Sequence, residues 1–194
     1  MSTRDRIAEA ALELFSEKGY DGTGVDEIGE TVGIKGPSIY RHYRGKEDIL
    51  YTLIEQFEDY YDEHYGQELT EEDIPSSLDE LVEMTMERVN DMIHDPFAGK
   101  MRRMIAQEQF RNEDLKEQMA RQELAGMENL YTEIFASMMD EGLLTEEDPR
   151  LLAFQFVSPI TLMIHLCDRN PELEDAALNR IRMHMELFAN TFGA

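Results

Sequence analysis

Apolar residues recur at the three- to four-residue spacing of an amphipathic helix along nearly the whole 194-residue chain. No sustained apolar–polar alternation indicates a strand, and the strong helix formers Glu, Leu, Met, Ala and Arg dominate. Gly19, Gly33 and Gly142 stand where helices would end, and Pro37 and Pro149 where helices would begin. The sequence therefore predicts an all-α protein of about nine helices.

The helices are predicted at residues 3–18, 25–32, 37–43, 46–65, 78–94, 97–110, 113–140, 149–168 and 172–192. Ser2 and Asp5, three residues apart, form a possible capping pair for the first. The short early helices predict a small head over residues 1–45. A continuous fourth helix would join this head to a helical body over residues 46–194.

Charge is distributed very unevenly along a chain whose formal net charge is -24. Residues 1–50 carry 7 basic and 10 acidic residues, whereas residues 51–194 carry 11 and 32. Residues 31–46 contain no acidic residue at all. Because the acidic body should repel nucleic acid, only the first fifty residues are candidates for binding it.

Residues 23–48 have the pattern of a helix-turn-helix, in which one helix braces a second that enters the major groove. Ile28 and Val32 would pack on Ile39, and Gly33 would allow the turn. With Ile39 inward, the outward side chains could bind guanine edges or phosphates through hydroxyl, imidazole and guanidinium donors. These outward residues are Ser38, Tyr40, Arg41 and His42. Tyr40 and His42 could instead pack against the head, and Arg44 is expected in solvent.

Residues 3–54 resemble the DNA-binding domain of TetR-family transcriptional regulators. The resemblance rests on Ile7, Ala10, Ala11, Leu14, Phe15, Gly19, Tyr20, Thr23, Ile28, Gly33, Ile34, Ser38, Ile39, Tyr40, His42, Tyr43, Lys46 and Leu50. It implies a dimer formed through the last two long helices and a small-molecule site inside the body. By position it implies DNA contacts from Thr23, Lys35, Gly36, Pro37, Ser38, Tyr40, Arg41, His42, Tyr43 and Lys46.

Three residues depart from the family's usual pattern. Gly24 stands where Ser or Thr is frequent, so one phosphate contact is in question. Gly29 replaces a usual alanine and is expected to weaken the second helix by about 1 kcal/mol. Pro37 replaces a frequent glycine and would stiffen the turn.

The body contains most of the 13 methionines of the chain, on apolar helical faces with several aromatic residues. Core packing accounts for most of them, but Met side chains can also re-pack around a ligand. The resemblance favours a cavity for an apolar effector. Its candidate lining residues are Phe57, Tyr61, Met84, Met101, Met104, Phe110, Met127 and Tyr131.

The last two predicted helices have wide apolar faces that a two-fold four-helix bundle would bury. The residues expected at this dimer interface are Leu152, Phe156, Ile160, Ile164, Ile181, Met185 and Phe188. Two heads in such a dimer would read half-sites about 34–36 Å apart.

Together these features predict a cytoplasmic, ligand-responsive transcriptional regulator, most simply a repressor, that binds a pseudo-palindromic operator as a homodimer. The single cysteine, Cys167, is consistent with a reducing compartment, and the apolar run at residues 151–167 is expected to be too short and too polar for a membrane span. No nucleophile–base pair, phosphate loop, cofactor motif or paired Glu-x-x-His set is evident, so neither an enzyme, a cofactor nor a metal is expected. The alternatives are an acidic helical interaction module and a carrier of a metal or small molecule that does not bind DNA.

Overall fold

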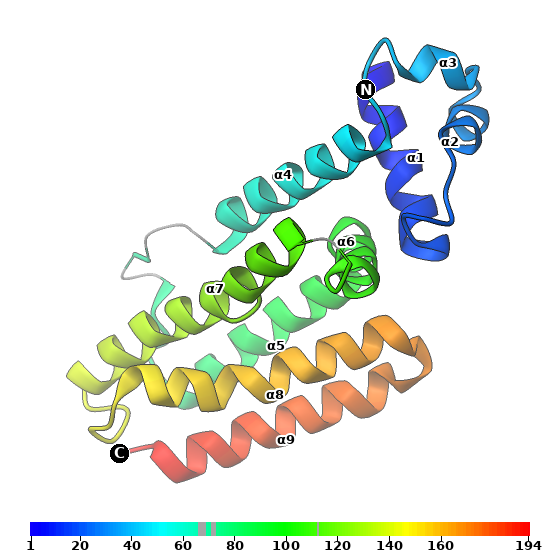
Figure 1. Ribbon diagram of the computed structural model, residues 1–194. Helices are drawn as coiled ribbons and strands as arrows, with labels where there is room; N and C mark the ends of the chain where they lie inside the picture. The colour runs from blue at the N-terminus through cyan, green and yellow to red at the C-terminus, as the bar shows by residue number, and fades with distance from the viewer. Residues whose placement is uncertain (66–68, 71–72, 112) are drawn as a thin grey trace. The chain divides into compact units, whose positions relative to one another are not determined.

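The computed structural model describes residues 1–65, 69–70, 73–111 and 113–194, without the side chains of residues 62, 65 and 113–125. Helices account for most of this part of the chain, and it contains no strand (Figure 1). They are α1 (Thr3–Lys18), α2 (Val25–Val32), α3 (Gly36–Ile39), α4 (Lys46–Tyr65), α5 (Leu78–His94), α6 (Pro96–Glu108), α7 (Glu113–Asp140), α8 (Pro149–Arg169) and α9 (Glu174–Phe192). A 3-10 turn at Pro171–Leu173 precedes α9. The all-α prediction is confirmed.

Most helix ends lie where capping chemistry predicts them. Ser2 and Asp5 form a complete capping box at the start of α1, and Asp148 accepts hydrogen bonds from the first backbone N–H groups of α8. The third helix is shorter than predicted, because after Ile39 the backbone continues in turns. Arg41 N–H donates to Ser38 O, and His42 N–H donates to Ile39 O.

The chain divides into two compact units that are interleaved in sequence. Unit 1 contains residues 1–62 and 96–119, and unit 2 contains residues 63–95 and 120–194. Unit 1 thus holds α6 together with the four N-terminal helices, and α7 begins in unit 1 and continues into unit 2. The predicted division at residue 45 separates a DNA-binding part from an effector-binding part, whereas these two units are defined by packing. The division at residue 45 therefore stays a prediction.

The core of unit 1 is assembled from α1, α2, α3, α4 and α6. Ile7 and Phe15 of α1, Ile28 of α2 and Ile39 of α3 are fully buried in it, as is Met101 of α6. Helix α6 packs along α1, which itself packs on α2. The three-helix head is therefore not a separate core, since α6 completes it.

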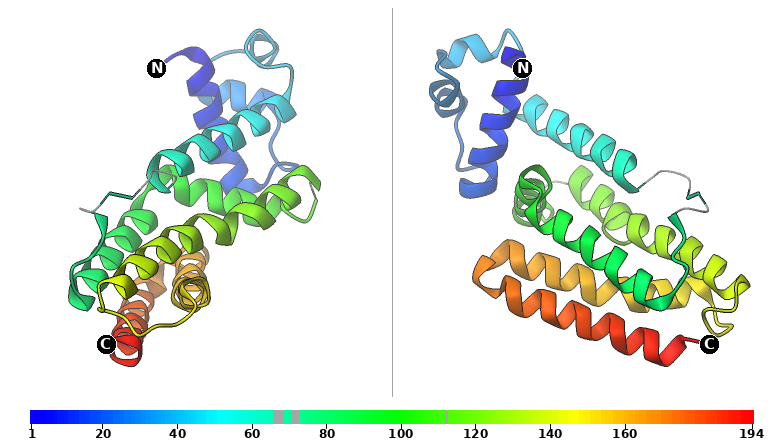
Figure 2. Two further views of the ribbon diagram at one scale, coloured as in Figure 1. Left: turned by 90° about the vertical axis from the view of Figure 1, so that its left-hand side faces the viewer. Right: turned by 180° about the vertical axis from the view of Figure 1, so that it is seen from behind.

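Unit 2 is built around the pair α8 and α9, which lie side by side in all views (Figure 2). Its centre is aromatic: the rings of Tyr131, Phe135, Phe156 and Phe188 lie within 4.8–5.8 Å of one another wherever they pair. The Tyr131 hydroxyl donates to Thr85 Oγ1 at 2.9 Å. Burial raises the pKa of Tyr131 to about 12.

Among the described residues, α8 has the length and composition of a membrane span, with a mean hydropathy of 1.5 over its most apolar window. The expectation that this stretch is too short and too polar is therefore wrong on composition. Core helices of soluble proteins can have the same properties, and one side of α8 forms the core of unit 2. Its other side carries exposed apolar residues, among them Leu151, Phe154 and Leu162.

Candidate nucleic-acid interface

The turn between α2 and α3 depends on two glycines. Gly33 ends α2 in the left-handed region, at φ 77°. At Gly29, an added Cβ would lie 2.9 Å from Ile34 O and 3.0 Å from Gly36 N. Glycine at position 29 thus permits a close approach of the turn to α2. The expectation that it only weakens the helix left out this contact.

The segment from α3 to the start of α4 presents an exposed basic surface. Lys35, Arg41, His42 and Arg44 are exposed, and Tyr40 is 59% exposed. Within the described part of the chain, none of the cationic side chains of Lys35, Arg41 and Arg44 pairs with a carboxylate. In a protein of net charge -24, this unpaired positive surface can attract phosphates.

The other predicted contact residues are less accessible. Pro37 is exposed at the start of α3 and Ser38 is half-buried, whereas Gly36 is buried, and an added Cβ there would lie 3.1 Å from Asp26 Cα. These residues set the backbone of the turn. Their DNA contacts stay predictions.

Three predicted contact side chains are engaged inside unit 1. Thr23 Oγ1 donates to Gly19 O at 3.0 Å, and the buried Tyr43 donates through its hydroxyl to Arg4 O at 3.1 Å. Lys46 Nζ donates to Tyr20 O at 2.6 Å and to Thr23 O at 2.9 Å. A phosphate contact by any of them would have to displace these hydrogen bonds.

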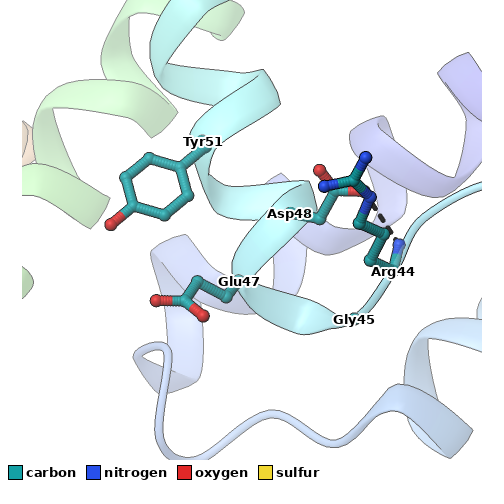
Figure 3. A pocket seen from close by; sticks show the side chains of 5 residues that line it. All are labelled: Arg44, Gly45, Glu47, Asp48 and Tyr51. Carbon is teal, nitrogen blue, oxygen red and sulfur yellow. Dashed lines mark hydrogen bonds between the residues drawn. The ribbon is translucent and has the colours of Figure 1, made fainter.

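A pocket of about 250 Å³ adjoins the basic segment where α4 begins (Figure 3). Arg44, Gly45, Glu47, Asp48 and Tyr51 line it. The Asp48 carboxylate accepts a hydrogen bond from Arg44 N–H at 2.8 Å, and this bond ties the residues before α4 to its first turn. Arg44 is exposed there, at the end of the basic segment.

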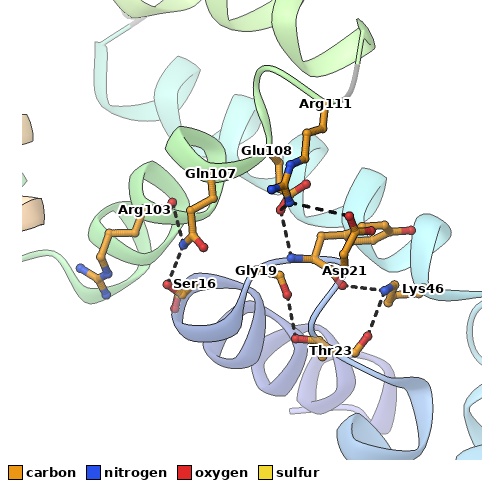
Figure 4. Close-up of polar contacts among 10 residues, drawn as sticks. Ser16, Gly19, Asp21, Thr23, Lys46, Arg103, Gln107, Glu108 and Arg111 are labelled. Carbon is orange, nitrogen blue, oxygen red and sulfur yellow. Dashed lines mark hydrogen bonds and ion pairs between the residues drawn. The ribbon is translucent and has the colours of Figure 1, made fainter.

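The loop between α1 and α2 has polar contacts on two sides (Figure 4). On the α6 side, the buried Glu108 accepts a hydrogen bond from Tyr20 N–H at 3.1 Å, and Gln107 Nε2 donates to Ser16 O at 3.0 Å. On the α4 side, the Lys46 ammonium holds Tyr20 O. Sequence reasoning missed Glu108, because one acidic residue near a helix end carries no distinguishing pattern.

Two of the basic residues of α6 have structural roles. Lys100 forms an ion pair with Glu13 of α1, and Arg102 is buried. The charges of Lys100 and Arg102 are therefore engaged within unit 1.

The candidate effector residues are divided between the two units. Phe57, Met101 and Met104 are buried in the core of unit 1, with Tyr61 packed against Phe57 at 5.2 Å between ring centroids. Met127 and Tyr131 are buried in unit 2, and Met84 packs against that core. Phe110 is 84% exposed, so it lines no interior in unit 1. An effector site at these residues stays a prediction.

Burial corrects the predicted dimer contacts. All seven residues, Leu152, Phe156, Ile160, Ile164, Ile181, Met185 and Phe188, are at most 4% exposed within unit 2. They belong to the core of unit 2, so outward residues of the same helices are better placed to contact a partner. Other residues of the same helices are outward: Leu151, Phe154 and Leu162 on α8, and Met183 and Leu187 on α9, are 46–66% exposed.

No group of three or more His, Cys, Asp or Glu side chains that could hold a metal ion occurs among the described residues. The single thiol, Cys167, is buried.

Two family models match the chain. That of "Bacterial regulatory proteins, tetR family" matches residues 7–52, which include α2, α3 and the basic segment. That of the C-terminal domain of AefR-like transcriptional repressors matches residues 79–181, more than half of the chain. The two matches cover parts of both compact units.

Among curated proteins, the chain is similar to IcaR of Staphylococcus epidermidis, a negative transcriptional regulator of the biofilm operon icaADBC. The two are 47% identical over 58 residues, 30% of this chain and 31% of IcaR. IcaR of Staphylococcus aureus strain Newman is 44% identical over 57 residues. The matched segment thus spans about a third of the length of these relatives.

Solved structures share the fold over nearly the whole chain. The SmeT–triclosan complex superposes with a TM-score of 0.73 at 18% identity, covering 100% of this chain and 93% of SmeT. SmeT is the repressor of the Stenotrophomonas maltophilia multidrug efflux pump SmeDEF. FadR of Bacillus subtilis, in complex with stearoyl-CoA, gives a TM-score of 0.64 at 21% identity, covering 95% and 97%.

Proposed function

The chain belongs to the TetR family of bacterial regulatory proteins, and from this premise we propose that it is a ligand-responsive repressor that binds operator DNA. The observation that carries the proposal is the unpaired basic surface of Lys35, Arg41 and Arg44 in a protein of net charge -24. Arg41 donates to guanine or phosphate from α3 and its following turn, with Tyr40 and His42 beside it.

The regulator binds DNA as a homodimer, formed through the outer sides of α8 and α9. The exposed apolar residues Leu151, Phe154, Leu162, Met183 and Leu187 support this surface. A depression of about 470 Å³ lies beside them, lined by Pro159, His184, Phe188 and Phe192 among others. A second copy, related by a two-fold axis, would bury this surface and present two heads to a pseudo-palindromic site.

The effector is a small, largely apolar molecule bound within the body. Two structural neighbours were solved with apolar or acyl ligands, triclosan and stearoyl-CoA. In unit 1, the buried Met101 and Met104 have side chains of the adaptable kind that re-packs around varied shapes. Binding favours one conformation of the body and shifts the dimer away from the state that matches the operator. The regulator acts in the cytoplasm, where its operator is, and it catalyses no reaction.

The test begins with selection of duplex fragments from genomic DNA by the parent protein. Arg41→Ala should then weaken binding to the selected duplex by about 10-fold to 100-fold, because a good bidentate contact contributes about 1–3 kcal/mol. Affinity is measured by fluorescence anisotropy at one fixed salt concentration.

Arg103→Ala is the matched control. It removes the same charge from α6 of unit 1, where Figure 4 shows Arg103 pointing away from Lys46 and the loop between α1 and α2. If Arg41→Ala and Arg103→Ala bound the duplex equally well, the assignment of the recognition surface would be wrong. If the parent selected no fragment above background, the proposed function itself would fail.

A further inference from the structure

We infer that Glu108 of α6 is a positioning residue for DNA binding, which fixes the loop between α1 and α2 through its carboxylate. The inference rests on the proposed function and deepens it. It states that a residue of α6, outside the three-helix head, determines how firmly the DNA-binding helices of the head are held. Glu108 touches no DNA. It acts through the backbone of Tyr20.

The burial of Glu108 is the first argument. The residue is only 3% exposed, and a buried carboxylate is costly unless it accepts hydrogen bonds. Its Oε1 accepts one from Tyr20 N–H at 3.1 Å, and Arg111 Nη1 lies 4.0 Å from the same oxygen. Arg111 also lies 3.7 Å from Asp21 of the loop. Charged groups at the end of α6 and just after it thus lie against complementary groups of the loop.

Lys46 holds the same residue of the loop from the other side. Its Nζ donates to Tyr20 O at 2.6 Å and to Thr23 O at 2.9 Å, and it lies 4.1 Å from the centroid of the Tyr20 ring. The backbone N–H of Tyr20 is therefore bound by a carboxylate from α6, and its backbone C=O by an ammonium from α4. We call this arrangement the Tyr20 clamp.

The clamp leaves little freedom at the point where the chain leaves α1. Gly19 adopts φ 76°, and an added Cβ there would lie 3.4 Å from Gln107 Oε1 and 3.5 Å from Glu108 Oε1. The loop leads into α2, which braces α3. Releasing Tyr20 therefore lets α2 and α3 move against α1, and fewer molecules hold the geometry that fits the groove.

Helix α6 connects the clamp to the core of unit 1. Met101 and Met104 are fully buried on the same helix that carries Glu108. A shift of α6 along its axis would move the carboxylate away from Tyr20 N–H. The position of α6 therefore sets how firmly the loop is held.

The test compares Glu108→Ala and Glu108→Gln with the parent in two measurements. The first is amide hydrogen exchange at Tyr20, followed by NMR, and it requires no DNA. The second is affinity for the duplex that the parent selects from genomic DNA, at fixed salt. Glu55→Gln is the control, since it removes one exposed carboxylate of the same unit.

We expect Glu108→Ala to speed exchange at Tyr20 and to weaken duplex binding, each by about tenfold, because a charged hydrogen bond is removed. Glu108→Gln keeps an acceptor oxygen and should recover most of both effects. Removing a negative charge should by itself strengthen DNA binding slightly, as Glu55→Gln will show. In a double variant Glu108→Ala/Lys46→Met, the acceleration of exchange at Tyr20 should be smaller than the product of the accelerations in the two single variants. The reason is that both side chains hold the same residue, Tyr20.

The outcomes separate the inference from the proposed function. Unchanged exchange at Tyr20 in Glu108→Ala would overturn the clamp whether or not the protein binds DNA. Faster exchange with unchanged duplex affinity would overturn the positioning role. A parent that binds no duplex overturns the proposed function, while the exchange result still decides the clamp. If Glu108→Ala does not fold, Lys46→Met replaces it in the exchange measurement alone, because Lys46 donates to Tyr20 O and is itself a predicted DNA contact. Unchanged exchange at Tyr20 in Lys46→Met would then overturn the clamp.

Discussion

At the scale of single residues, position 29 has no room for a methyl group. We expect Gly29→Ala to destabilise unit 1 by about 1 kcal/mol or more, because overpacking against the backbone of Ile34 and Gly36 exceeds the gain in helix propensity. Urea unfolding measures the change. Glu30→Ala is the control, since residue 30 is exposed on the same helix. A stabilised Gly29→Ala would show that the turn can move apart at low cost.

The buried hydroxyl of Tyr131 gives a pH dependence whose sign is fixed. Its pKa is raised to about 12, from an unfolded value near 10, so the folded state holds this proton more tightly. The resulting stability is fully present below pH 10 and is lost as pH rises through 12. The whole effect is about 2–3 kcal/mol.

Tyr131→Phe should therefore lose less stability between pH 9 and pH 11.5 than the parent does, in urea unfolding at each pH. Thr85 keeps its own hydrogen bond to Leu81 O in this variant, so the core stays satisfied. The matched control is Tyr40→Phe, which removes a hydroxyl at an exposed position. Equal slopes for parent and Tyr131→Phe would contradict the pKa argument.

Sequence reasoning selected basic and hydroxyl residues in the head but could not say which donors are already engaged. Arg41 and Lys46 look equally available as positive charges in a basic segment. Arg41 is exposed, whereas Lys46 donates to two backbone carbonyls of the loop between α1 and α2. That difference depends on hydrogen bonds between residues 23 and 26 positions apart in sequence, which no local pattern reports.

At the scale of helices, periodicity predicted where elements begin and end, because caps and breakers are local. Helices α1, α2, α5 and α7 lie where the pattern placed them. Periodicity could not separate the two apolar sides of α8 and α9. One side is the core of unit 2 and the other is exposed, and both consist of the same residue types. The dimer contacts were therefore assigned to the core side.

The two sides of α9 should respond differently to substitution. Leu187→Glu, at a position 66% exposed, should shift the protein from dimer to monomer with little loss of helix content. Sedimentation velocity and circular dichroism measure the two properties. Phe188→Ala is the counterpart on the core side, and it should cost about 3–5 kcal/mol of stability. If Leu187→Glu remained a dimer, the interface would have to lie elsewhere on the protein.

At the scale of the whole molecule, residues 51–194 carry most of the net charge of -24. Binding to DNA then depends on a few cations and should be strongly sensitive to salt. If Lys35, Arg41 and Arg44 of two heads each neutralise one phosphate, the logarithm of affinity falls with that of salt at a slope of about -5.

Arg41→Ala should make this slope shallower by about 2, because each head of the dimer would neutralise one phosphate fewer. Titrations of the selected duplex at several salt concentrations measure it, with Arg103→Ala as the matched control. A slope unaffected by Arg41→Ala would mean that its guanidinium does not neutralise a phosphate, although it could still read a base.

The interleaving of the two units limits how this regulator can be rearranged by recombination. Cutting the gene after residue 62 would separate the DNA-reading end from α6, which supplies part of its interior and the Glu108 contact. A hybrid that fuses only this front portion to a foreign sensor would expose Ile7, Phe15 and their neighbours. Functional chimaeras should instead arise from exchanges that keep residues 96–119 with their original head.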